Sequence, residues 1–186
     1  MTLRAFHFAV GLSVALLLIV PLDAAGDPAL PRVRVLHPAL ASTLRDAQHH
    51  SAALRAVVAE LDAHILIVHI VAGRVDIDHA AGALTFVVDT GTHRFARITV
   101  NPDLPHEVLA GLLAHELWHA VEVAREEWVV DGSTMAALYR RIGTAGCPRR
   151  AAPCYDTAAA QDFGRRVMLD VKTARRAFGS ARAAAQ

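Results

Sequence analysis

The stretch Leu113-Ala-His-Glu-Leu-Trp-His-Ala-Val-Glu-Val-Ala124 contains the pattern H-E-x-x-H, formed by His115, Glu116 and His119. Residues four apart lie one turn apart on the same face of a helix, so both imidazoles can reach one metal ion. Imidazole nitrogens bind Zn²⁺ at about 2.0–2.1 Å, and the glutamate beside them can act as a general base on a water molecule that the metal activates. We therefore expect a zinc site with His115 and His119 as ligands and Glu116 as the catalytic residue.

The apolar residues around this pattern also indicate a helix. They recur at helical spacing and form one stripe, made of Leu109, Leu112, Leu113, Leu117, Ala120 and Ala124. The two histidines lie along the border of this stripe, and Glu116 lies between that border and the stripe itself. A carboxylate in such a place costs free energy unless it has a partner, which favours a functional role for Glu116.

A third ligand from the part of the chain after the motif must be acidic. His119 is the last histidine and Glu127 is the last glutamate in the sequence. A catalytic zinc site has three protein ligands and one open position. The downstream candidates are Glu122, Glu126, Glu127, Asp131, Asp156, Asp162 and Asp170.

These candidates differ in where the chain places them. Glu122 lies one turn beyond the motif on the same helix face. Three ligands on one straight helix point nearly parallel and bind a metal poorly, so we expect Glu122 to support the site or to pair with an arginine such as Arg140 or Arg141. Asp131 and Asp156 each precede a predicted helix, where an aspartate can also serve as an N-cap.

The motif and its surroundings resemble a known class of protein. Residues 113–124 are similar to the active-site helix of the zincin metallopeptidases. More closely, the run from about Arg94 to Val167 resembles a group of small exported bacterial proteins. Their pattern continues with an Ala-Leu-Tyr-Arg-Arg-Ile-Gly-like segment, here 137–143, and with an aromatic-Glu-Thr sequence that opens the last helix. Tyr155-Asp156-Thr157 occupies that position here, with Asp in place of Glu.

The resemblance implies Asp156 as the third metal ligand, although aspartate reaches one methylene less far than glutamate. Asp131 ranks second, because its spacing from His119 is similar to that in zincins with an aspartate ligand. Their Gly-Thr-x-Asp signature is missing here. The resemblance also implies a zincin-like fold in which an edge strand, here Phe95–Val100, binds a peptide substrate. Candidate donors to an oxyanion are Tyr139, Tyr155, His93 and Arg94.

The remaining sequence predicts an α+β fold. Residues 26–37 read as an extended lead-in. The elements expected after it are a helix over Ala39–Ala63 with an irregularity near Ser51, strands over Ile65–Val71, Leu84–Val88 and Phe95–Val100, a long helix from Pro105 to about Arg125, a shorter one from Asp131 to Ile142, and a last amphipathic helix from about Asp156. We expect a small mixed or antiparallel sheet of about three strands, packed on the helix that carries H-E-x-x-H.

Composition limits the classes of protein that need to be considered. The chain has 186 residues, of which 54% are hydrophobic and 20% charged, with a formal net charge of +1. These values suit one globular domain and argue against a nucleic-acid binder. Residues 1–25 read as a signal peptide, which leaves residues 26–186 as a single exported domain. We expect no stable membrane insertion after cleavage. An uncleaved N-terminal anchor is the alternative.

Two cysteines, Cys147 and Cys154, lie close together in the sequence. In an oxidising compartment such a pair is expected to form a disulfide that closes a small loop. A zinc-binding pair is the alternative, but the chain has no other cysteine and no later histidine to complete a second site.

These observations lead to two hypotheses of function. The first is an exported zinc-dependent metallohydrolase, most simply a peptidase with peptide or protein substrates. The second is an exported zincin-like binding domain without catalytic activity, in which the metal is structural or absent.

Overall fold

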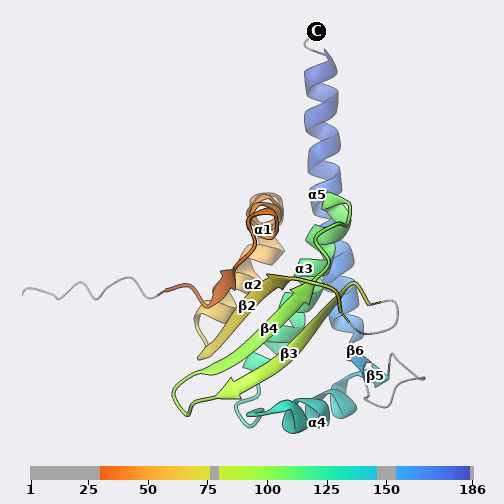
Figure 1. The fold of residues 1–186 in the computed structure, drawn as a ribbon. Coiled ribbons are helices and arrows are strands. Elements are labelled where there is room, and N and C mark those ends of the chain that lie inside the picture. The colour runs from red at the N-terminus through yellow and green to blue at the C-terminus, as the bar shows by residue number, and fades with distance from the viewer. Residues whose placement is uncertain (1–29, 76–79, 146–153, 185–186) are drawn as a thin grey trace, which may run out of the picture. The chain divides into compact units, whose positions relative to one another are not determined.

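The computed structural model describes residues 30–75, 80–145 and 154–184 of the chain (Figure 1). In chain order its elements are β1 (Val33–Val35), α1 (Pro38–His50), α2 (Ala52–Asp62), β2 (Leu66–Ala72), β3 (Gly82–Asp89), β4 (Arg94–Val100), α3 (His106–Ala124), α4 (Gly132–Ile142), β5 (Thr144–Ala145), β6 (Tyr155–Asp156) and α5 (Ala158–Ala184). The predicted signal peptide and Cys147 of the predicted disulfide lie outside the described residues.

Four strands form a mixed sheet in the order β1-β2-β4-β3. β2 pairs in parallel with β1 on one side and with β4 on the other, whereas β3 and β4 are antiparallel. A separate antiparallel pair is formed by β5 and β6. The α+β class and the three predicted strands are confirmed. The prediction missed β1, because a strand of three residues is too short to show an alternating pattern.

The expectation that Phe95–Val100 forms an edge strand was wrong. This segment is most of β4, which lies between β2 and β3, and the edge strands of the sheet are β1 and β3. The tight turn at Thr90–His93 makes β3 and β4 neighbours, and β4 then pairs with β2 along its whole length. Ala96 and Ile98 have no exposed surface, as suits an interior strand.

The sheet turns one face toward the helices. In β4, Ala96, Ile98 and Val100 are fully buried, while Arg97 between them is exposed. Five of the six residues of the predicted apolar stripe are at most 3% exposed in the core, and the sixth, Leu112, is partly buried; the five are Leu109, Leu113, Leu117, Ala120 and Ala124. The core therefore holds the motif-bearing helix firmly against the sheet.

Two glycines let α5 approach α3 closely. A Cβ atom built on Gly164 would lie 2.8 Å from the carbonyl oxygen of Gly111 and 3.0 Å from the Cβ of His115. A side chain at Gly164 would push α5 away from the helix that carries the motif. In Figure 1 the C-terminal part of α5 extends beyond the sheet. Neither α5 nor any other described helix is both long and apolar enough to cross a membrane.

The predicted helix Ala39–Ala63 is two helices that meet at Ser51. The Ser51 hydroxyl accepts a hydrogen bond from the Leu54 N–H at 3.4 Å, which makes Ser51 the N-cap of α2. The same hydroxyl donates to Asp170 of α5 at 2.7 Å. The irregularity expected near Ser51 is thus a helix boundary, and it fixes α5 against the N-terminal helices.

Candidate metal centre

Three side chains from two segments meet beside the sheet. His115 and His119 lie one turn apart on α3, and Asp156 ends β6 just before α5 begins. The Nε2 atoms of the two histidines are 3.2 Å apart. The Oδ1 atom of Asp156 lies 3.4 Å from each of these nitrogens. Within the described ranges, this is the one group of histidine, cysteine and acidic side chains arranged closely enough to hold a metal ion.

The separations fit a zinc ion. Bonds of about 2.0–2.2 Å at tetrahedral angles place neighbouring ligand atoms roughly 3.3–3.5 Å apart. The observed separations of 3.2, 3.4 and 3.4 Å are close to that range. Two imidazoles and one carboxylate are also a ligand set that catalytic zinc sites use. The side chains of His115 and Asp156 are 21% and 31% exposed, so the cluster is open to solvent.

Each histidine has a hydrogen-bond acceptor besides the cluster. The Nδ1 atom of His119 lies 2.8 Å from Oε2 of Glu122. His115 hydrogen bonds the backbone carbonyl of Ala160, in the first turn of α5. In metal sites such acceptors fix the orientation and tautomer of a histidine ligand. His119 therefore turns its Nε2 atom toward His115 and Asp156.

The protonation of the cluster suits a carboxylate ligand. Burial would raise the pKa of Asp156, but hydrogen bonds from His119 and Gln161, with the nearby His115, lower the pKa to about 2. Burial and the neighbouring His119 lower the pKa of His115. Burial acts in the same direction on His119, but hydrogen bonds to Asp156 and Glu122 outweigh it and raise the pKa of His119 to about 9.

Glu116 points from α3 toward the start of β3 and is 4% exposed. A Cβ atom built on Gly82 would lie 2.9 Å from its Oε1 atom, so the strand passes directly over the carboxylate. Burial raises the pKa of Glu116 to about 7, against the lowering effects of His119 and of a hydrogen bond with the Leu84 backbone. The partner that a carboxylate at this position requires is therefore the backbone of β3.

The other acidic candidates for a third ligand have different partners. Asp131 is the exposed N-cap of α4 and accepts hydrogen bonds from Ser133 and Thr134. Glu122 faces Nδ1 of His119 and not the Nε2 atoms of the cluster. Of the two arginines expected as alternative partners of Glu122, Arg140 and Arg141, the second pairs instead with Glu126. Of the ranked candidates, only Asp156 joins the two histidines.

Two of the candidate oxyanion donors are occupied elsewhere. Arg94 is 1% exposed and donates to four carbonyl oxygens, those of Val123 and Ala124 at the C-terminal end of α3 and those of Glu126 and Val129 in the segment that follows. The Tyr139 hydroxyl donates to the carbonyl oxygen of His119 at 3.1 Å, and burial raises its pKa, so the phenol stays protonated. Both side chains thus donate hydrogen bonds to backbone carbonyl oxygens of α3.

Sequence reasoning missed two residues that contact the site. Thr157 is 4% exposed and donates from its hydroxyl to Oε1 of Glu122 at 2.7 Å. Its place after Asp156 in the aromatic-acidic-threonine sequence was the signal that could have identified it. Gly82, the neighbour of Glu116, has no such signal, because only the folded chain brings residues 82 and 116 together.

No protein-family model matches the chain, and neither a curated protein nor a solved structure matches it. The geometry of the cluster is therefore the basis for the functional proposal.

Proposed function

We propose that this chain is an exported zinc-dependent metallohydrolase with peptide or protein substrates and a zincin-like active-site helix. The observation that carries the proposal is the position of Glu116 beside a cluster of His115, His119 and Asp156. The cluster has the separations of a zinc site. Glu116 has a pKa near neutrality.

Each residue would have a distinct role. His115, His119 and Asp156 would hold the metal, which when bound supplies a Lewis acid that polarises a carbonyl and acidifies water. Glu116 would take a proton from the attacking water and return it to the leaving group. A general base works best when its pKa lies near the operating pH, and burial raises the pKa of Glu116 to about 7.

The edge strand β3 supports a peptide as substrate. Gly82 and Leu84 of β3 both contact Glu116, and β3 has β4 as its sole partner in the four-stranded sheet of the described residues. An extended peptide can pair with the open side of an edge strand through main-chain hydrogen bonds. A peptide paired with β3 would lie close to the proposed base.

One observation favours the second hypothesis, a zincin-like binding domain without catalytic activity. Glu116 is 4% exposed, and a base must reach a water molecule at the reacting carbonyl. If β3 stays over the carboxylate when substrate is present, the cluster would bind metal without hydrolysis. Activity therefore requires that β3 and Glu116 leave room for that water.

Metal analysis of the purified mature chain, followed by a peptide-library cleavage assay with and without chelator, tests the proposal. We expect about one zinc ion per chain and cleavage that the chelator abolishes. The Glu116→Gln variant should keep its zinc and lose hydrolysis, because the amide cannot accept the proton. Zinc without turnover on any peptide would leave only the binding domain. A chain without zinc after gentle purification would contradict the zinc-dependent hydrolase and a structural zinc, and would leave only a binding domain without metal.

Location and partners belong to the same proposal. The signal-like residues 1–25 support export, and the net charge of +1 gives no reason to expect a nucleic-acid partner. Detection of the mature chain outside the cytoplasm, with a new N-terminus near residue 25, would test the export step separately from catalysis.

A further inference from the structure

We infer that Glu122 is a positioning residue that links the two segments bearing the metal ligands. It holds His119 on α3 with one carboxylate oxygen, and with the other it holds the segment that carries Asp156. This inference rests on the proposed metal site, but it assigns Glu122 a role outside the ligand set.

The first half of the link is the contact with His119. Oε2 of Glu122 lies 2.8 Å from Nδ1 of His119, on the side of the ring opposite the Nε2 atom that faces the cluster. The side chains of His119 and Glu122 are 7% and 10% exposed, so water competes little for this hydrogen bond. Glu122 thereby accepts the Nδ1 proton and fixes the ring orientation, which turns Nε2 toward the cluster.

The second half of the link reaches Asp156 through Thr157. Oε1 of Glu122 accepts the Thr157 hydroxyl proton at 2.7 Å. The Thr157 oxygen also accepts the N–H of Ala160 at 3.1 Å, which makes it the cap of α5. Its backbone N–H donates to Oδ1 of Asp156 at 2.7 Å, and this is the same oxygen that lies 3.4 Å from both histidine nitrogens.

These contacts form a closed ring of polar groups: His119, Glu122, Thr157, Asp156 and back to His119. Two of its members are proposed ligands and two are not. Removal of Glu122 breaks the ring on both sides at once, because its carboxylate is the partner of both His119 and Thr157. The packing of α5 on α3 would remain, but the polar side chain that ties the α3 ligands to the ligand before α5 would be lost.

The test is the dissociation constant of Zn²⁺, measured on the mature chain by competition with a chromophoric chelator. Loss of such a supporting group costs about 10–100-fold in metal affinity, and we expect that loss in Glu122→Ala. Glu122→Gln keeps an oxygen that can accept a hydrogen bond from His119, so it should retain part of the zinc affinity that Glu122→Ala loses. Thr157→Val should weaken zinc binding, whereas Thr157→Ser, which keeps the hydroxyl, should not. The double variant Glu122→Ala/Thr157→Val should be no weaker than Glu122→Ala alone.

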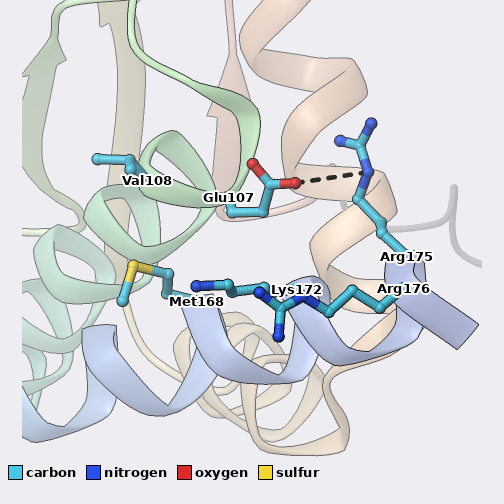
Figure 2. A pocket seen from close by; sticks show the side chains of 6 residues that line it. All are labelled: Glu107, Val108, Met168, Lys172, Arg175 and Arg176. Atoms are coloured by element: carbon cyan, nitrogen blue, oxygen red, sulfur yellow. Dashed lines mark ion pairs between the residues drawn. The ribbon is translucent and has the colours of Figure 1, made fainter.

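Glu107 offers a matched control on the same helix. It lies in the first turn of α3 beside an open cavity of about 400 Å³ and pairs with Arg175 at 3.7 Å (Figure 2). Glu107→Ala removes the same side chain about two turns from His115, so zinc affinity should not change. The absorption spectrum of the Co²⁺-loaded chain should change in Glu122→Ala and stay as in the parent chain in Glu107→Ala, because only the former alters ligand geometry.

The outcomes separate this inference from the proposed function. Suppose that the parent chain binds zinc and Asp156→Ala does not. If the zinc dissociation constants of Glu122→Ala and Thr157→Val then lie within about twofold of that of the parent, the inference about Glu122 is wrong, whereas the proposed metal site is supported. The inference is equally wrong if the variants lose only thermal stability of the metal-free protein. If the parent chain binds no zinc, the proposed function is wrong, and this inference, which rests on it, is wrong as well. If Glu122→Ala does not fold, the zinc dissociation constants of Glu122→Gln and Thr157→Val decide whether the inference is right.

Discussion

Gly82 faces the carboxylate of Glu116 so closely that a Cβ atom at residue 82 would lie 2.9 Å from Oε1 and 3.2 Å from Cγ of the glutamate. The missing side chain of Gly82 is therefore what gives the proposed base its position between α3 and β3. None of the three proposed metal ligands is among the atoms nearest to that Cβ.

This relationship predicts that Gly82→Ala separates catalysis from metal binding. The added methyl group should displace the Glu116 carboxylate, and misplacement by about 1 Å can cost on the order of 100-fold in rate. Zinc content should stay as in the parent chain. Gly132→Ala is the control, because a Cβ there meets no atom within 4 Å. Full activity in Gly82→Ala would show that β3 does not position the base.

The choice of third ligand is tested by comparing two aspartates. Asp156→Ala should remove most of the bound zinc, because it deletes one of three ligands in the cluster. Asp131→Ala should leave zinc content unchanged and lower the thermal midpoint slightly, because it removes the N-cap of α4. Zinc loss in Asp131→Ala with retention in Asp156→Ala would reverse the assignment.

Arg94 should be a major contributor to stability. Its guanidinium donates to four carbonyl oxygens at the end of α3 and in the segment after it, and two of them, those of Val123 and Glu126, also accept a backbone N–H. A buried acceptor that is left without a donor costs about 1–3 kcal/mol. We expect Arg94→Ala to lower the free energy of unfolding by about 3 kcal/mol or more in urea titrations followed by circular dichroism. Arg97→Ala, an exposed arginine on the same strand, should change it little. Equal values for the two variants would contradict this role.

Removal of the metal should destabilise the folded chain. A ligand at 100 times its dissociation constant stabilises the native state by about 2.7 kcal/mol, which for a chain of this size corresponds to roughly 5–10 °C in thermal midpoint. Addition of chelator should lower the midpoint of the parent chain by this order. In His119→Ala the chelator should have no effect. An identical response in both proteins would show that zinc acts elsewhere.

The elements that sequence analysis predicted best are those with a strong local pattern. The apolar stripe of α3 recurs over five turns, and the helix observed at His106–Ala124 lies within the predicted limits. Asp131 was expected to cap a helix reaching Ile142, and it does so at Gly132–Ile142. The strand β1 was missed, because its three residues have a partner only through parallel pairing with β2.

The residues of the candidate site also divide into those with a local sequence pattern and those without one. His115, Glu116 and His119 follow from spacing within one helix. Asp156 depended on a resemblance, because no spacing along the chain relates it to the motif. Thr157 contacts Glu122, and Gly82 lies against Glu116. Contacts between residues so far apart in the chain leave no periodic signal in the sequence. For the same reason the sequence did not reveal the partners of Arg94, one of the candidate oxyanion donors, since its carbonyl partners lie about thirty residues away.

Asp156 follows α4 and lies far from the motif along the chain, so a bound metal would affect local unfolding of the segment between the motif and Asp156. A metal ion shared by His119 and Asp156 would fasten the ends of the segment 120–155 together, as a reversible cross-link. Chelation would release that cross-link without cutting the chain, so a protease should gain access to α4 before the sheet unfolds. The time course of limited proteolysis, with and without zinc, would thus report on the cluster even when no substrate is known.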